Sequence, residues 1–176
     1  QRGNAKTVWL PAGVVIPWSI GGELWRVNVR RPAGVEPKYG GPSGCGVGLY
    51  GADSIIPGRP AVLVEGEFDA LTVEQCAGDV TAAVATGSTS GAQRAKWLAR
   101  LALASTVLVA FDADTAGDDA ARYWTTVLPN ARRWRPLQSD VNAMMQAGDD
   151  VRAWVVMGLP GMAKPTTATM AAKSVA

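Results

Sequence analysis

Two short apolar runs, each ending in acidic residues, constrain the fold of this chain more than any other feature. The first, residues 62–64, leads directly into Glu65-Gly66-Glu67-Phe68-Asp69, and the second, residues 106–111, leads into Asp112-Ala113-Asp114. Short apolar runs bounded by turn-forming residues are typical of buried strands in a parallel sheet. Because ligands of open α/β sheets bind outside the carboxyl ends of the strands, these acids are expected to lie in a binding site.

Residues 60–159 alternate predicted strands and helices, which is the pattern of an α/β fold, a parallel sheet flanked by helices. The expected strands are residues 61–64, 80–84, 106–111 and, at the edge of the sheet, 131–135. The expected helices are residues 69–76, 90–103, 116–127, 140–147 and 150–157. Gly66 and Gly117 are expected to allow sharp turns between the acids and the helices that follow.

Residues 1–59 differ in composition and are predicted to form a separate, small α+β lobe. They are rich in glycine and proline, with β-prone runs at residues 14–17 and 24–29. The second run alternates apolar and polar positions, as a half-buried strand does, so the lobe is expected to be partly antiparallel. Residues 160–176 have no periodic face and are expected to be a disordered tail.

Charge is distributed unevenly, although the formal net charge is only +2. Residues 26–38 contain four basic residues and one acid, whereas residues 65–79 contain five acids and no base. A basic region beside an acidic one suits an anionic polymer together with a metal ion.

The residue types in this sequence exclude several kinds of chemistry. There is no histidine, which excludes nucleophilic catalysis by Ser–His or Cys–His pairs and every zinc site with a histidine ligand. Cys45 and Cys76 lack C-x-x-C spacing and are expected to be unpaired thiols in a reducing cytoplasm. No signal peptide or stretch long enough to span a bilayer is evident.

The clustered carboxylates predict a site for a divalent cation. Mg²⁺ takes oxygen ligands, usually one or two carboxylates, with water and substrate phosphates completing its octahedron. Several acids in one pocket repel each other unless a metal neutralises them. Such a site suits phosphoryl or nucleotidyl transfer. Two alternatives remain: D-x-D after a strand also occurs in phosphatases with an aspartyl nucleophile, and Glu67 and Asp79 are interpreted as helix-start or loop acids.

The two acidic segments together resemble the Toprim signature. Residues 65–69 match E-G-x-x-D and residues 112–117 match D-x-D-x-A-G. Toprim domains occur in bacterial-type primases, type IA and type II topoisomerases and certain nucleases. Residues 85–90 are similar to a small-residue turn of primases, with a helix N-cap at Ser88 or Ser90 as the alternative. Residues 139–144 are similar to the K-D-x-N motif of phage and plasmid helicase-primases, with Ser139 in place of the usual lysine.

The Toprim resemblance implies roles for five acids. The implied catalytic residues are Glu65, Asp69, Asp112 and Asp114. The implied ligands for Mg²⁺ or Mn²⁺ are Glu65, Asp112, Asp114 and Asp140. Glu65 serves as a ligand or as the base for the primer 3′-hydroxyl, and a helix N-cap is the alternative role for Asp140.

The basic segment distinguishes among the Toprim proteins. Residues 22–30, 37–39 and 49–51 are similar in order and spacing to the segment that precedes Toprim in bacterial replicative primases. The resemblance implies that Arg30, Lys38 and Tyr39 contact template or incoming nucleotide, and arginine and lysine suit phosphate binding. Without the Toprim neighbour, Arg30 would be interpreted as part of a solvated edge strand.

Other aromatic and basic residues carry weaker predictions. Three tryptophans fall in predicted helices and are expected in the core: Trp97, Trp124 and Trp154. Trp25 and Tyr39, beside basic residues, are candidates for stacking on bases. Three arginines near the last strand either extend a nucleic-acid track or lie on a solvated edge: Arg132, Arg133 and Arg135.

Together these resemblances imply the catalytic core of a DNA primase of a bacterial, phage or mobile-element type. Such a nucleotidyltransferase makes short RNA primers from ribonucleoside triphosphates on a single-stranded DNA template. The resemblance also implies a replicative helicase partner or a fused helicase domain, although the sequence contains no P-loop motif. The alternatives are a Toprim nuclease, which would use the same acids to activate water, and a noncatalytic DNA-binding module.

Overall fold

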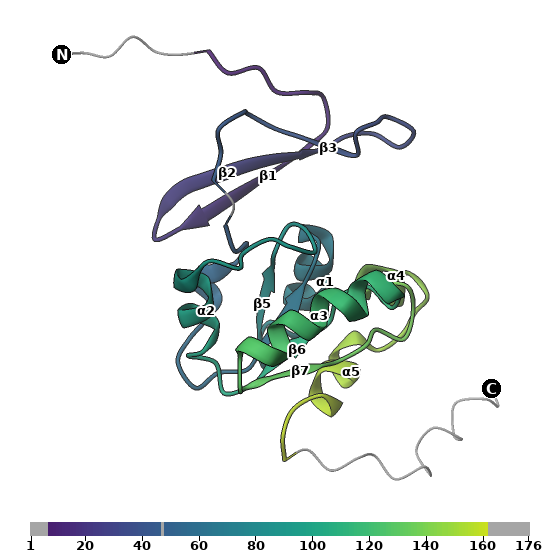
Figure 1. Cartoon of the computed structure of the whole chain (residues 1–176). Helices are drawn as coiled ribbons and strands as arrows, with labels where there is room; N and C mark the ends of the chain where they lie inside the picture. Colours follow the sequence, from purple (N-terminus) through teal and green to yellow (C-terminus); the bar gives the residue numbers. More distant parts are fainter. Residues whose placement is uncertain (1–6, 47, 162–176) are drawn as a thin grey trace.

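Two sheets of different type make up the described part of the chain, which comprises residues 7–46 and 48–161 of a computed structural model. The antiparallel sheet has the order β1 (Val14–Ile20), β2 (Glu23–Arg30) and β3 (Tyr39–Gly40). The parallel sheet has the order β5 (Ala82–Ala85), β4 (Ala61–Val64), β6 (Val107–Val109) and β7 (Ala131–Arg133). Figure 1 shows the antiparallel sheet above the parallel one.

The parallel sheet and its helices confirm the predicted α/β fold. Every pairing within this sheet is parallel. The helices are α1 (Glu67–Ala77), α2 (Ala95–Leu101), α3 (Thr115–Val127), α4 (Val141–Gln146) and α5 (Val151–Met157), with a 3₁₀ turn, η1, at Ala52–Ser54. Strands β4, β5 and β6 are buried along their whole length, as expected for a parallel sheet with helices on both faces.

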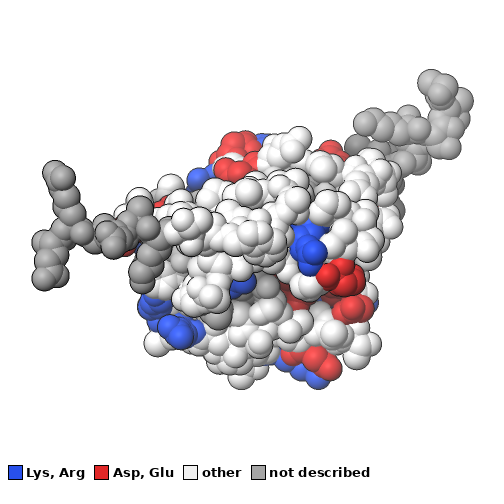
Figure 2. Space-filling view, turned by 90° about the horizontal axis from the view of Figure 1, so that it is seen from above, with Lys and Arg blue, Asp and Glu red and all other residues white. Residues whose placement is uncertain are grey.

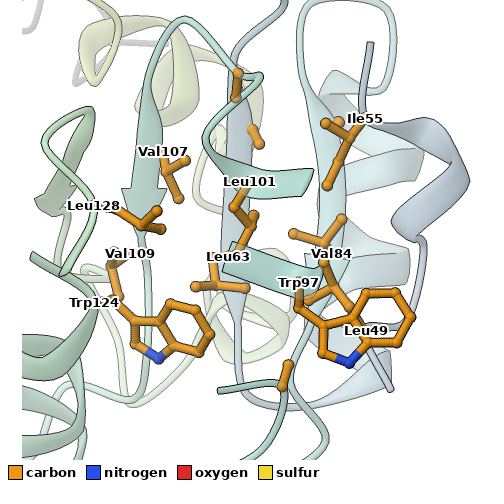
Figure 3. Packing of buried hydrophobic residues seen from close by; sticks show 14 of the residues in the cluster. Leu49, Ile55, Leu63, Val84, Trp97, Leu101, Val107, Val109, Trp124 and Leu128 are labelled. Carbon is orange, nitrogen blue, oxygen red and sulfur yellow. The ribbon is translucent and has the colours of Figure 1, made fainter. Parts of the chain in front are cut away.

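The core is divided into two layers by the parallel sheet. On one face, Leu63, Val84 and Val109 pack against α2 and α3, which contribute Trp97 and Trp124 (Figure 3). On the opposite face, alternate strand residues pack against α1, α4 and α5, where Trp154 is buried. The predicted burial of Trp97, Trp124 and Trp154 is therefore confirmed. Burying a large apolar side chain contributes about 1.5–3 kcal/mol, so these layers dominate the stability of the fold.

The predicted helix over residues 90–103 is wrong in its first half. The helix α2 begins only at Ala95, with Arg94 as its N-cap, so neither Ser88 nor Ser90 caps it. Residues before Arg94 form turns instead, in which Thr86 donates a side-chain hydrogen bond to the Ser88 carbonyl oxygen at 2.7 Å. Ala92 has φ +57°, in the left-handed region, which interrupts a right-handed helix.

The antiparallel lobe is anchored to the parallel sheet through the β1–β2 hairpin. Gly21 and Gly22 both have positive φ, as the hairpin turn of an antiparallel pair favours. The amide nitrogen of Gly21 donates to both carboxylate oxygens of Asp53 in η1, at 3.0 and 2.8 Å. Trp25 of β2 meets Trp97 of α2 edge-on, with ring centroids 6.0 Å apart. These contacts fix one sheet over the other.

The ends of the chain are only partly described. The predicted disordered tail, residues 160–176, lies outside the described residues apart from its first two positions. Across the part of the chain that the structure describes, no helix is long and apolar enough to cross a membrane.

Candidate active site

A cleft of about 610 Å³ lies between the antiparallel lobe and the carboxyl ends of the parallel strands β4 and β6. Its lining residues are Arg26, Asn28, Arg30, Lys38, Tyr39, Glu65, Gly66, Glu67, Phe68, Asp69, Gly87, Ser88, Asp112, Asp140, Asn142 and Gln146. Figure 2, viewed from above, shows that charged side chains of both signs form small separate groups on an otherwise neutral face. The lining residues give the cleft a basic wall, formed by Arg26, Arg30 and Lys38 of the lobe. Its acidic floor is formed on the side of the parallel sheet by Glu65, Asp69, Asp112 and Asp140.

Glu65 lies at the first residue after β4, on the acidic floor. Its carboxyl pKa is raised from 4.5 to about 7, first by burial and then by the negative charges of Asp112, Asp114 and Asp69. Its buried Oε1 atom has no hydrogen-bond partner among the described residues. A half-buried carboxyl surrounded by other acids favours a proton or a cation as its partner.

Asp69 folds back from the first turn of α1 toward Glu65. Its Oδ1 atom accepts a hydrogen bond from the backbone nitrogen of Asn142 at 2.9 Å, which ties α1 to the start of α4. Burial raises its pKa from 3.8 to about 6; the Asn142 hydrogen bond opposes this rise, and the charges of Asp140 and Asp112 add to it. Asp69 therefore belongs to the same electrostatic cluster as Glu65.

The other three predicted acids are placed differently with respect to the cleft. Asp112 lines it, and its pKa is raised by burial and then by the charges of Asp140 and Asp114, with Arg133 acting in the opposite direction. Asp114 caps α3 by accepting a hydrogen bond from the Gly117 nitrogen at 2.7 Å and does not line the cleft. Asp140 does both, because it lines the cleft and accepts from the Ala143 nitrogen at 2.6 Å.

Gly66 and Gly117, the two glycines of the acidic segments, do not form the sharp turns predicted for them. Other parts of the acidic segments lie close to their backbone instead. Gly66 is extended, with φ −100° and ψ 153°. A Cβ at Gly66 would lie 3.0 Å from Oδ2 of Asp69. Gly117 is the third residue of α3, and a Cβ there would overlap the backbone carbonyl of Asp112. Gly117 therefore requires glycine, because the backbone carbonyl of Asp112 lies against it, whereas a Cβ at Gly66 would only displace the end of the Asp69 side chain slightly.

The basic wall is built on the alternation of β2. Arg26, Asn28 and Arg30 are spaced by two along this strand and all line the cleft, because every second side chain of a strand points to the same face. The guanidinium of Arg30 lies 5.0 Å from the ring centroid of Tyr39 and 6.0 Å from that of Phe68. With Lys38, the cleft presents three cations to the acidic floor.

Glu67 is the first residue of α1, which confirms its interpretation as a helix-start acid, but its side chain is buried. It is 2% exposed, and its Oε1 atom accepts hydrogen bonds from the indole nitrogen of Trp18, at 3.0 Å, and from the side-chain amide of Asn28. Both donors belong to the antiparallel lobe. Glu67 therefore also joins α1 to the basic wall, a role that its position in the sequence did not indicate.

Comparison with known families identifies the acidic half of this site. A family model described as Toprim-like matches residues 62–151, just over half of the chain, and covers every acid of the cleft floor. The chain belongs to the Toprim-like family. A search of curated proteins finds no match.

Solved structures resemble the Toprim-like domain together with its antiparallel lobe. The primase fragment of the bacteriophage T7 primase-helicase is 24% identical, covering 79% of this chain and 60% of that chain, with a TM-score of 0.62. A DNA primase domain from Pseudomonas aeruginosa is 26% identical, covering 80% and 49%, also with a TM-score of 0.62.

A third structure shows primase domains of two bacteriophage T7 gp4 subunits bound to an RNA/DNA hybrid and dTTP while they interact with the lagging-strand DNA polymerase. It is 23% identical, covers 79% of this chain and 73% of that chain, and has a TM-score of 0.59. The chain thus has the fold of primase domains, as the sequence resemblance implied. It spans 60% of the first of these structures and 49% of the second.

The acids of the Toprim-like floor fit a divalent cation. Within residues 7–46 and 48–161, no three or more Asp, Glu or Cys side chains are arranged so that they could hold a metal ion by themselves. Mg²⁺ needs no such arrangement, because it is usually held by one or two carboxylates together with water and substrate phosphates. The Oε1 atom of Glu65, which has no hydrogen-bond partner among the described residues and lies near other carboxylates, would gain a partner from such an ion.

Some predicted binding residues fall outside the cleft, and others were missed. Trp25 lies between Trp97 and Lys96, whose Nζ atom is 3.9 Å from its ring centroid, and it does not line the cleft. Cleft residues absent from the predicted site are Arg26, Asn28, Gly66, Glu67, Phe68, Gly87, Ser88, Asn142 and Gln146. The alternation along β2 could have revealed Arg26 and Asn28, and no comparable signal marks Gln146.

Proposed function

We propose that this chain is the catalytic core of a DNA primase, which joins ribonucleoside triphosphates into short RNA primers on single-stranded DNA in a reaction that requires Mg²⁺ or Mn²⁺. The observation that carries the proposal is the cleft itself, in which carboxylates at the ends of two parallel strands face a wall of three cations. Acids that hold a metal and bases that hold phosphates are the two components that phosphoryl transfer requires.

The basic wall binds the polyanions in this proposal. Arg30 is oriented by its contacts with Tyr39 and Phe68, so its fork is ordered before a phosphate arrives. Arg26 and Lys38 add charge along the same wall. Tyr39 offers a ring for template or nucleotide, which fits the RNA/DNA hybrid and dTTP bound by the similar bacteriophage primase domains.

In this proposal the acidic floor binds the metal and can accept the proton of the primer 3′-hydroxyl. The proposed ligands come from Glu65, Asp112, Asp114 and Asp140, with Asp69 supporting them; one or two of these carboxylates would contact the ion directly, and water and substrate phosphates would complete its coordination. When bound, the cation neutralises charge on the transferred phosphoryl group and lowers the pKa of the attacking hydroxyl. Glu65 is either a ligand or the base for the primer 3′-hydroxyl, and without a bound cation, burial and the neighbouring acids raise its pKa to about 7.

The wider setting of the reaction is part of the same proposal. The similar bacteriophage T7 fragment comes from a protein that is both primase and helicase. We therefore expect this core to act in the cytoplasm with a replicative helicase, either as a partner or as a fused domain. Co-purification or template-stimulated unwinding assays with a replicative helicase would test this.

The primary test is primer synthesis by the variant Asp112→Asn. Labelled ribonucleotides, Mg²⁺ and mixed single-stranded templates should yield primers with the unaltered chain and at least about 100-fold fewer with the variant. Binding of single-stranded DNA should be retained. Asp119→Asn is the matched control, because Asp119 is exposed on the neighbouring helix α3 and pairs there with the exposed Arg122.

Three outcomes would contradict the proposal. Normal primer synthesis by Asp112→Asn would remove this acid from the catalytic site. Cleavage of DNA with Mg²⁺ in the absence of nucleotides, without primer synthesis, would identify a nuclease that uses the same acids. Failure to bind Mg²⁺ or Mn²⁺ in titration calorimetry would instead indicate a noncatalytic DNA-binding module.

A further inference from the structure

Arg133, the last residue of β7, lies directly behind the segment that carries Asp112. Its Nη1 atom donates to the carbonyl oxygens of Val109, at 3.1 Å, and Phe111, at 2.7 Å. Its Nη2 atom donates to the carbonyl oxygen of Asp112 at 2.7 Å. Its Nε atom lies 2.9 Å from Oδ1 of Asp118, and Nη2 lies 2.8 Å from the same oxygen. These contacts engage all the donors that a guanidinium possesses.

Two of the carbonyls that Arg133 binds, those of Phe111 and Asp112, lie beyond the end of β6, while that of Val109 also accepts a hydrogen bond from the Trp134 nitrogen at 3.0 Å. Strand β6 stops at Val109, and the chain then turns away from β7 toward α3. Phe111 is completely buried, so its carbonyl oxygen has little access to water. An unpaired buried carbonyl costs free energy comparable to a lost hydrogen bond. The guanidinium supplies the partners that a further strand would otherwise provide.

A second arginine, Arg135, and a backbone hydrogen bond of Ala113 also hold the segment next to Asp112. Arg135 donates from Nη2 to the carbonyl oxygen of Ala113 at 2.9 Å, and the same atom lies 3.3 Å from Oδ2 of Asp118. The nitrogen of Ala113 donates to the carbonyl oxygen of Ser139 at 2.8 Å. Asp118, on α3, therefore orients both arginines. Together the two arginines bind the carbonyl oxygens of three successive residues, Phe111, Asp112 and Ala113.

We infer that Arg133 is a positioning residue for the proposed metal site, holding the backbone from which Asp112 projects into the cleft without touching nucleic acid itself. The inference rests on the proposed function. The sequence suggested that Arg133 lies either on a solvated edge or in a nucleic-acid track. It is not a simple solvated edge residue, since its side chain is only 22% exposed. It is not available to bind nucleic acid either, because its donors already bind the protein. Lysine could not replace it, because a single ammonium cannot reach three carbonyls and a carboxylate in a fixed plane.

The positive charge of Arg133 also supports the proposed metal site. It lowers the pKa of Asp112 and, more weakly than the other causes, that of Glu65, against burial and the neighbouring acids. A fixed cation behind the carboxylates thus favours the ionised forms that a metal requires. Partners that orient metal ligands from behind typically change metal affinity or activity by about 10–100-fold when they are removed.

The test compares Arg133→Lys and Arg133→Gln with Arg132→Gln, a control on the adjacent, exposed residue of β7. We expect both Arg133 variants to bind Mn²⁺ about tenfold more weakly in titration calorimetry and to lose kcat by a similar factor, with KM for nucleotide and affinity for single-stranded DNA within about twofold. Hydrogen exchange of residues 109–114 should be faster in both. Asp118→Asn, which leaves Arg133 in place but removes its orienting carboxylate, should produce a smaller effect of the same kind.

Three outcomes would overturn the inference or locate the error. Arg133→Lys with the Mn²⁺ affinity, kcat and exchange rates of the unaltered chain would remove the positioning role. Selective loss of DNA affinity would place Arg133 in a nucleic-acid track instead. If the unaltered chain made no primers, the proposed function would fail, but Mn²⁺ affinity and hydrogen exchange would still decide whether Arg133 positions the acids. If Arg133→Gln failed to fold, Arg133→Lys and Asp118→Asn would carry the test.

Discussion

In the absence of divalent metal, the folded state of this chain should become less stable as pH rises from about 5 to about 7.5. In the folded state, burial and neighbouring carboxylates raise the pKa of Glu65 from 4.5 to about 7 and that of Asp69 from 3.8 to about 6. Both pKa values lie above those of the unfolded chain, so between about pH 4 and pH 7 the folded state binds more protons. The stability that these protonated groups contribute is therefore fully present below about pH 4 and lost as pH rises through about 6–7.

The size of the effect follows from the two raised pKa values. Each pKa unit corresponds to about 1.4 kcal/mol, so a fully buried Glu65 would contribute about 3 kcal/mol. Because Glu65 is half-buried, solvent screening reduces its share to about 1–2 kcal/mol. Asp69 is more enclosed and adds about 2 kcal/mol. A combined change of about 3 kcal/mol lowers the melting temperature of a chain of this size by roughly 6–12 °C.

Thermal melting of the protein in EDTA, followed at several pH values, measures this effect directly. The absence of histidine makes the assay selective, because no side chain with an ordinary pKa near 6.5 is present to mask the change. Mg²⁺ should remove or reverse the decrease, since a cation favours the ionised carboxylates. Glu65→Gln should reduce the slope in EDTA.

A control and a contrary result complete the test. Asp79→Asn should leave the slope unchanged, because the exposed Asp79 pairs with Arg152, which lowers its pKa and confines its titration to more acidic pH. A melting temperature in EDTA that stays constant or rises between about pH 5 and pH 7.5 would refute the electrostatic account of the acidic floor.

Three further substitutions test the architecture around the cleft by urea unfolding. Gly117→Ala places a Cβ on the carbonyl of Asp112 and should cost about 1–3 kcal/mol, whereas an unchanged midpoint would mean that α3 shifts freely. Trp124→Ala removes a fully buried ring and should cost about 3–5 kcal/mol, and a loss below about 1 kcal/mol would contradict its central place in the core. Trp18→Phe removes a donor to the buried Glu67 and should cost about 1–3 kcal/mol, while Trp18→Phe with native stability would show that Glu67 finds another partner.

The fold could be predicted because its signals are local. The strand β4 has the predicted bounds 61–64, and the helices α1, α3, α4 and α5 lie within one or two residues of the predicted ranges, since apolar periodicity and capping acids are encoded in short segments. The start of α2 could not be predicted in this way. Ala92 adopts a left-handed conformation that its neighbours in the sequence do not signal, because tertiary contacts impose it.

The acids of the candidate site were predictable for the same reason. Glu65, Asp69, Asp112 and Asp140 stand at strand ends or helix starts, and a parallel sheet brings such positions to one edge. The role of Asp114 was less predictable, because a D-x-D spacing does not distinguish an acid that lines the cleft from one that caps α3.

The sequence by itself determined the parallel sheet, the acidic edge and the membership of the Toprim-like family, because each depends on residue types at short, regular spacing. Only the tertiary structure decided that Glu67 is buried between two lobes and that Arg133 holds the backbone of Asp112. The partners of both side chains come from distant parts of the chain. Buried charges and free carbonyls must find partners, and packing, rather than local spacing, determines which residues come within reach.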